Sequence, residues 1–125
     1  MTQKKKRQFG VWIDTHHAII VGRADSWSTD FTVLGMAGDV GDVHVAPPKK
    51  QYPDASILQD RFFKEILFYM RNAEEVHVTG TGKWQEEFMS YMANSPQCKD
   101  TTTGVSISEK MSDEELAEYI QSKFN

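Results

Sequence analysis

The chain has 125 residues, with 14 basic against 18 acidic side chains and a formal net charge of −4. This length predicts a single domain, and the ordinary apolar content supports one packed core without covalent staples. The single cysteine, Cys98, excludes an internal disulfide, and no apolar run is long enough to cross a membrane. We expect a cytoplasmic protein with no membrane partner and no secretion signal.

The basic residues are unevenly distributed. Four of the 14 stand together near the start: Lys4, Lys5, Lys6 and Arg7. The rest of the chain keeps ten basic against 18 acidic residues, which argues against a broad nucleic-acid-binding face. We expect residues 1–8 to form a basic, flexible arm and residues 9–125 to form one α/β domain. The arm has two interpretations, a solvated tail or a contact to RNA phosphates.

The first part of the chain has the pattern of three strands. Residues 9–14 are rich in strand formers, and alternation places Phe9, Val11 and Ile13 on one face and Trp12 on the other. A turn leads into a returning strand at residues 18–22. A third strand is predicted at residues 31–34. Glycine and proline then interrupt residues 35–53, which predicts a long loop in which residues 43–45 could add a short strand.

Helices and strands alternate in the remainder. Asp54 is a candidate N-cap for a helix that begins near Ala55. Its apolar residues recur at helical spacing: Ile57, Leu58, Phe62, Phe63, Ile66, Leu67 and Met70. A strand at residues 75–79 and a tight turn at 80–82 follow. The next helix begins near Trp84 and ends before Pro96.

The last two predicted elements are a strand at residues 102–107 and a helix opened by a capping box from Ser112 to Glu115. The order of elements predicts an α/β fold with a five-stranded mixed sheet. An antiparallel hairpin plus a third strand would be followed by two parallel strands, with about three helices. This is the ribonuclease H-like layout in outline.

Several of these segments resemble the middle domain of archaeal and eukaryotic peptide-chain release factors. The residues that carry the resemblance are 9–14 followed by 18–22, Pro47-Pro48-Lys49-Lys50 before the first helix, and residues 76–80 with Lys83 and Phe88. The chain is also similar to stand-alone bacterial proteins described as translational machinery components, through residues 80–88 and the acidic last helix. The resemblance runs from Phe9 to Phe124 and implies a fold used in translation.

One motif of the release factors is missing. Their middle domain carries Gly-Gly-Gln on the loop before the first helix, whereas the corresponding stretch here reads Lys49-Lys50-Gln51. Lysines cannot readily adopt the backbone shapes that two glycines allow. We therefore expect no hydrolysis of peptidyl-tRNA, no catalytic residue and no cofactor. The sequence favours a non-catalytic accessory protein of translation that binds the ribosome or RNA.

Lysine and arginine side chains are the expected contacts to RNA, because they neutralise phosphates. They come from the arm, from the long loop and from the turn after the fourth predicted strand: Lys4, Lys5, Lys6, Arg7, Lys49, Lys50 and Lys83. An alternative is a protein–protein module or a homodimer, with Trp27 in a polar turn as the partner contact.

A metal-dependent nuclease of the ribonuclease H type is a further alternative. It would place Asp14, at the end of the first strand, beside other carboxylates from Asp60, Glu65, Glu109 or Asp113. The remaining patterns favour structural roles. The turn before Lys83 lacks the spacing of a phosphate-binding P-loop, His77 alternates with valines on a strand, and Cys98 is expected to be an exposed thiol in a polar loop. No metal site is predicted.

Overall fold

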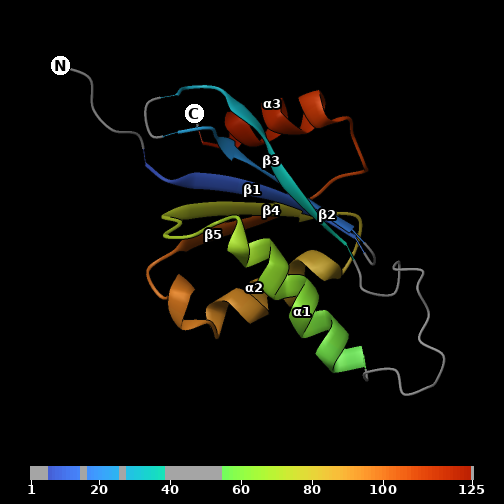
Figure 1. Cartoon of the computed structure of the whole chain (residues 1–125). Coiled ribbons are helices and arrows are strands. Elements are labelled where there is room, and N and C mark those ends of the chain that lie inside the picture. The colour runs from blue at the N-terminus through green and yellow to red at the C-terminus, as the bar shows by residue number, and fades with distance from the viewer. Residues whose placement is uncertain (1–5, 15–16, 26–27, 39–54, 125) are drawn as a thin grey trace.

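The computed structural model describes residues 6–14, 17–25, 28–38 and 55–124, and the side chains of the first helix from residue 60 onward (Figure 1). The elements in chain order are β1 (Gln8–Ile13), β2 (His17–Arg23), β3 (Phe31–Gly38), α1 (Ala55–Phe68), β4 (Glu75–Gly80), α2 (Trp84–Ala93), the short 3₁₀ turn η2 (Pro96–Cys98), β5 (Thr102–Ile107) and α3 (Asp113–Lys123). Within these ranges, no helix is long and apolar enough to span a membrane.

The strands form one five-stranded sheet in the order β3-β2-β1-β4-β5. The pairs β1–β2 and β2–β3 are antiparallel, and β1–β4 and β4–β5 are parallel. This confirms the predicted mixed sheet. It leaves β3 and β5 as the two edge strands.

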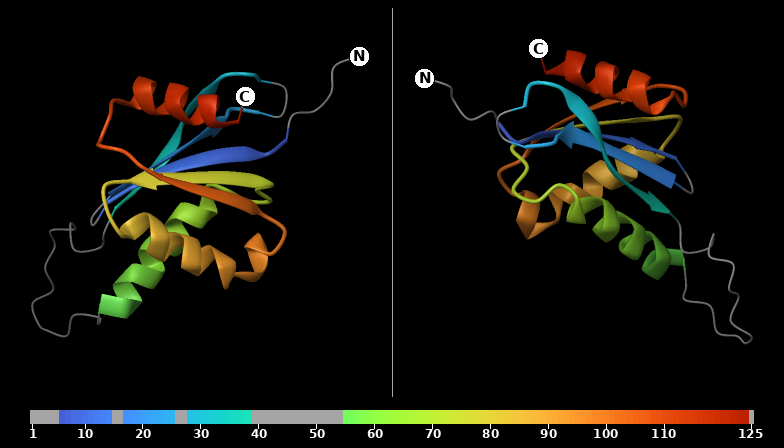
Figure 2. Two further views of the ribbon diagram at one scale, coloured as in Figure 1. Left: turned by 180° about the vertical axis from the view of Figure 1, so that it is seen from behind. Right: turned by 45° about the horizontal axis from the view of Figure 1, so that its top comes forward.

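Helices cover both faces of the sheet. Helices α1 and α2 lie on one face and α3 on the other, as the two views of Figure 2 show. Strand β1 is therefore buried on both sides: Val11 packs in the core under α1 and α2, and Trp12 packs with Leu116 and Ile120 under α3. A β-carbon at Gly10 would overlap the Ile120 side chain, so glycine allows α3 to approach β1 closely. The predicted alternation along β1 is confirmed.

Strand β3 is longer than predicted. The prediction ended this strand at Leu34 and gave the following glycines to a loop, but β3 continues to Gly38, which pairs with His17. Pairing with β2 outweighs the low strand propensity of glycine. Gly35 also has a packing role, because a β-carbon there would overlap the ring of Tyr69. The rest of the predicted loop, with its short strand at residues 43–45 and the N-cap Asp54, lies outside the described residues.

The first strand includes one residue of the segment expected to form the arm, Gln8. Strand β1 already begins at Gln8, and the backbone N–H of Arg7 donates to a Glu74 carboxylate oxygen at 2.8 Å. In return the Arg7 carbonyl accepts from the Glu74 N–H at 2.8 Å. Arg7 and Gln8 are thus part of the domain, and Lys6 is the first described residue before it.

Candidate functional site

Basic side chains gather where β1 begins and β2 ends. We call Lys6, Arg7, Arg23 and Arg71 the basic end. A pocket of about 290 Å³ opens there. Arg71 does not line it, and the residues that do are Lys6, Arg7, Gln8, Phe9, Arg23, Ala24, Asp25, Leu34 and Tyr69. The antiparallel pairing of β1 with β2 creates the group, because it brings the last residue of β2 beside the first residues of β1.

Arg7 is held by the fold. Its guanidinium donates twice to the carbonyl of Arg71, from Nε at 2.9 Å and from Nη2 at 2.7 Å. It also lies over the ring of Phe9, 5.4 Å from the ring centre. These contacts fix Arg7, whereas Lys6 and Arg71 are exposed. The Arg71 guanidinium lies over the ring of Phe68, 5.2 Å from the ring centre.

Arg23 links the two neighbouring strands to the chain before β1. Its Nη1 donates to the Lys6 carbonyl at 2.8 Å, and its guanidinium lies 4.8 Å from the centre of the Phe31 ring. Burial lowers the pKa of Arg23 from its ordinary value, and the nearby charge of Glu75 opposes the shift. An arginine remains charged at neutral pH under such a shift. Sequence reasoning missed Arg23 and Arg71, because only the strand pairing and the turn after α1 bring them to Arg7.

Lys83 is not part of this group. Strands β1 and β4 run parallel. Arg7 lies just before the start of β1, whereas the exposed Lys83 follows the end of β4 and precedes α2. A six-residue strand is about 20 Å long, so the two lie at opposite ends of the sheet. The other predicted contacts lie outside the described residues: Lys4, Lys5, Trp27, Lys49 and Lys50.

The turn before Lys83 is held by a buried side chain that the sequence reasoning did not single out. The Gln85 amide nitrogen donates to the carbonyls of Gly80 at 3.2 Å and Ser106 at 3.3 Å. Its oxygen accepts from the Gly82 N–H at 3.3 Å. This supports the structural interpretation of the turn. Gly38, from which the chain leaves β3, lies at this same end of the sheet, because β2 pairs Ala18 with Ile13 and His17 with Gly38.

A polar network lies between the sheet and α3, and it too was missed. The Ser106 hydroxyl is 2.8 Å from His77 Nε2, 2.8 Å from the Tyr119 hydroxyl and 3.0 Å from Thr79 Oγ1. Thr79 Oγ1 is in turn 2.8 Å from the Ser108 hydroxyl. The register of β4 with β5, which sets His77 opposite Gly104, brings these groups together.

A serine beside a histidine is also the start of a nucleophilic site, so the geometry of the pair matters. Ser106 lines neither the pocket at the basic end nor the groove beside β3, and its hydroxyl is shared among three protein partners. Burial lowers the pKa of His77, and the positive charge of Lys123 adds to the shift. The network therefore fixes a neutral imidazole and ties α3 to β5, and we assign it a structural role.

The acidic residues do not converge. In the part of the chain that the structure describes, no group of three or more His, Cys, Asp or Glu side chains could hold a metal ion. Asp14 instead accepts the His17 N–H at 2.7 Å and closes the turn between β1 and β2. Asp60 lies 3.3 Å from Lys64 on the same helix. The nuclease alternative thus lacks a metal-binding cluster within the described ranges.

The prediction for Cys98 is wrong. Its side chain is buried in the core under α1 and α2, because η2 folds the segment after α2 back against that core. Burial raises the pKa of the Cys98 thiol, although hydrogen bonds from Ser95 and Thr101 oppose the shift. A protonated, buried thiol is a packing residue and a poor nucleophile.

Comparisons with known proteins give a fold but no family. No protein-family model and no curated protein matches the sequence. The structure is similar to Pelota of Archaeoglobus fulgidus, with a TM-score of 0.57 and 13% identity over 95% of this chain and 33% of that one. It is also similar to Pelota of Thermoplasma acidophilum, with a TM-score of 0.56 and 17% identity over 93% of this chain and 31% of that one. The chain therefore has the fold of one part of Pelota and spans about a third of its length.

Proposed function

We propose that this chain is a non-catalytic, cytoplasmic accessory protein of the translation machinery, which binds ribosomal RNA through its basic end. The observation that carries the proposal is the gathering of Lys6, Arg7 and Arg23 around one pocket, with the exposed Arg71 next to Arg7, in a domain that has the fold of part of Pelota. The resemblance to the middle domain of release factors leads to the same class of function. The missing Gly-Gly-Gln motif supports a role other than peptidyl-tRNA hydrolysis.

The charge distribution explains why binding would be local. The chain carries a net charge of −4, so most of its surface repels phosphates, and only a concentrated group of cations can hold RNA. In this proposal Arg7 and Arg23 form a fixed base, while Lys6, Arg71 and the predicted contacts Lys4 and Lys5 reach the phosphates. Lys83 would supply a second and separate contact from the opposite end of the sheet, and Lys49 and Lys50 stay predicted contacts.

The proposal is tested by the salt dependence of RNA binding. Anisotropy of a fluorescent ribosomal RNA fragment is measured between about 50 mM and about 200 mM salt for the wild type and for the double variant Lys5→Gln/Lys6→Gln. Loss of two phosphate contacts reduces the slope of log K against log salt by about 1.8. A double variant at exposed positions away from the basic end, Lys64→Gln/Lys110→Gln, is the matched control.

Either of two results contradicts RNA binding by the basic end. One is an affinity for RNA that does not change with salt. The other is an equal loss in both double variants, which would assign binding to net charge alone. Lys83→Gln, measured alone, should reduce the slope by about 0.9, and an unchanged slope removes the second contact from the proposal.

A second candidate function is a protein–protein module or homodimer. The exposed apolar side chains on edge strand β5 favour it. Ile107 and Val105 on β5 are 78% and 45% exposed, which is unusual for apolar side chains on an unpaired edge. Light scattering over a range of concentrations tests it. A mass that doubles with concentration and returns to one chain in Ile107→Lys supports self-association, and a constant mass of one chain contradicts a homodimer.

A further inference from the structure

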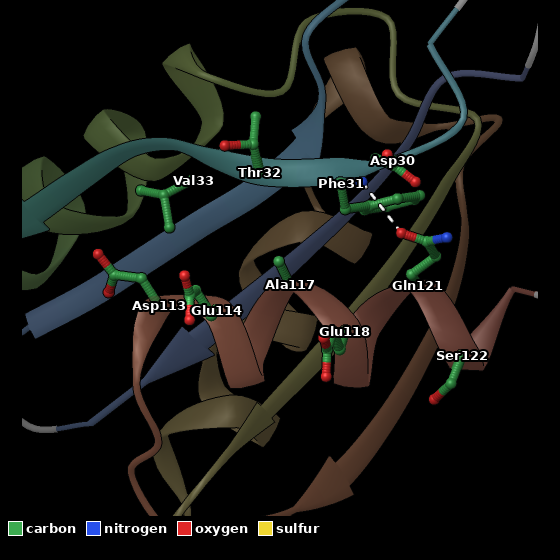
Figure 3. Close-up of a pocket in the computed structure, with 10 residues that line it drawn as sticks. All are labelled: Asp30, Phe31, Thr32, Val33, Asp113, Glu114, Ala117, Glu118, Gln121 and Ser122. Atoms are coloured by element: carbon green, nitrogen blue, oxygen red, sulfur yellow. Dashed lines mark hydrogen bonds between the residues drawn. The ribbon is translucent and has the colours of Figure 1, made fainter.

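The opposite edge of the sheet carries a groove that the proposed function does not use. Helix α3 packs alongside edge strand β3, and between them lies a groove of about 780 Å³ (Figure 3). Ligand-binding clefts in proteins commonly have volumes of about 300–1,000 Å³. The groove is open along β3 from Asp30 to Val33, so a chain segment could lie along it.

The charged residues that line this groove are all acidic. Asp30, Asp113, Glu114 and Glu118 are all exposed, and no lysine or arginine is among them. Asp113 and Glu114 stand in the first turn of α3, where acidic residues also stabilise the helix dipole. Asp30 and Glu118 have no such role, because one lies before β3 and the other in the middle of α3. The groove therefore repels RNA and attracts a cationic ligand.

The floor of the groove is an open strand edge. The Phe31 N–H donates to the Gln121 side-chain oxygen at 3.1 Å, so this N–H points away from β2 and toward α3, as Figure 3 shows. Groups of alternate residues in an antiparallel strand point to the same side, so the N–H and C=O of Val33 also face the open edge. Gln121 thus occupies the position that a carbonyl of an added strand would take, and none of the described strands pairs with β3 on this side.

We propose that this groove binds an extended, lysine- or arginine-rich segment of a partner protein. The segment pairs with β3 as an added strand, a common way in which a sheet edge recognises a peptide. Its cationic side chains lie against Asp30 and Glu118, and its backbone bonds to the open edge at Val33. Charge complementarity selects this partner, since all the charged residues that line the groove are acidic. The groove adjoins the basic end, because the Arg23 guanidinium lies over the ring of Phe31, but the two share no lining residue. The inference goes beyond the proposed RNA binding.

The test uses a fluorescein-labelled octapeptide that alternates lysine with threonine. The double variant Asp30→Asn/Glu118→Gln removes two charges without changing side-chain size. We expect it to weaken binding at least tenfold, while the control Glu65→Gln/Glu86→Gln, exposed on the helices of the opposite face, leaves binding unchanged. A peptide with proline at alternate positions, which cannot pair along an edge, should bind at least tenfold more weakly than the octapeptide.

Amide shifts locate the site independently of affinity. Binding should shift the signals of Thr32, Val33 and Gln121. Shifts confined to β5 or the basic end, equal losses in both double variants, or equal binding of the proline peptide would overturn the proposal. If the octapeptide binds more tightly after residues 1–5 are deleted, the groove belongs to the chain's own arm. If light scattering shows a dimer that the octapeptide dissociates, the groove belongs to a second copy of the chain. Both outcomes overturn the assignment to a partner protein.

Discussion

Gly80 of β4 lies so close to Ile13 of β1 that a β-carbon at Gly80 would overlap the Ile13 carbonyl oxygen. No described glycine has a positive φ, so the reason for glycine here is space and not backbone conformation. The two parallel strands come together at this point, where β4 passes into the turn before α2. Gln85 then spans from the Gly80 carbonyl to the neighbouring strand β5.

Gly80→Ala should therefore destabilise the fold. The added methyl group forces β1 and β4 apart in a packed region, at a cost of about 3 kcal/mol. Urea unfolding followed by circular dichroism measures the loss. Gly82→Ala is the control, because a β-carbon there meets nothing within 4 Å. Equal stability of both variants would show that the strands can separate freely at Gly80.

The stability of the protein should fall in mild acid because of His77. Burial lowers the pKa of this imidazole below its ordinary value of 6.5, so the unfolded chain binds the proton at a higher pH than the folded chain. The stability contributed by neutral His77 is present above pH 6.5 and is lost as the pH falls through the lower pKa of the folded state. Urea unfolding near pH 7.5 and near pH 5 should show this loss.

The variant His77→Gln separates this histidine from the other titrating groups. Glutamine keeps a polar contact to Ser106 but has no proton to gain in this range. The difference in unfolding free energy between the two pH values should be smaller in the variant than in the wild type. An identical difference would mean that His77 titrates as it does in the unfolded chain.

Substitutions at Arg7 and at Lys6 should have different effects: the first should lower stability, and the second should weaken RNA binding. Arg7→Gln removes both bonds to the Arg71 carbonyl and should lower the free energy of unfolding by about 1 kcal/mol. Lys6 is exposed, so Lys6→Gln should stay within about 0.5 kcal/mol of the wild type while weakening RNA binding. Urea unfolding and RNA anisotropy on the same preparations measure both effects. The reverse pattern, a stable Arg7→Gln and an unstable Lys6→Gln, would contradict these roles.

Native Cys98 should react slowly with a thiol reagent such as dithionitrobenzoate. The thiol is buried and its pKa is raised, so little thiolate is exposed to the reagent. We expect the reaction in buffer to be at least about 100-fold slower than in denaturant, since it must wait for local opening. Similar rates in both conditions would restore the exposed thiol expected from the sequence.

Local patterns were enough to predict most of the fold. The alternation at Val11 and Trp12 placed β1 in the middle of the sheet, and the Ser112 capping box marked the start of α3. Both signals arise from residues close together in the chain. The end of β3 could not be found this way, because Gly38 belongs to a strand only through its pairing with His17.

The candidate sites depended on contacts between distant residues. Arg23 joins Arg7 through strand pairing, and Ser106 joins His77 through the register of two parallel strands. The acidic groove likewise requires α3 to lie along β3, far away in the sequence. Composition showed that the chain is acidic with a basic start, but it could not show that four acidic residues line one groove while Lys6, Arg7 and Arg23 line another pocket.

Co-sedimentation with ribosomes is the most direct test of the proposed binding of the basic end to ribosomal RNA. Wild type, Lys5→Gln/Lys6→Gln and the control Lys64→Gln/Lys110→Gln are centrifuged with ribosomes at low and high salt. We expect the wild type and the control to pellet with ribosomes at low salt and to be released at high salt, while the variant of the basic end stays in the supernatant. Failure of the wild type to pellet at either salt concentration would contradict a role in translation and leave only the shared fold.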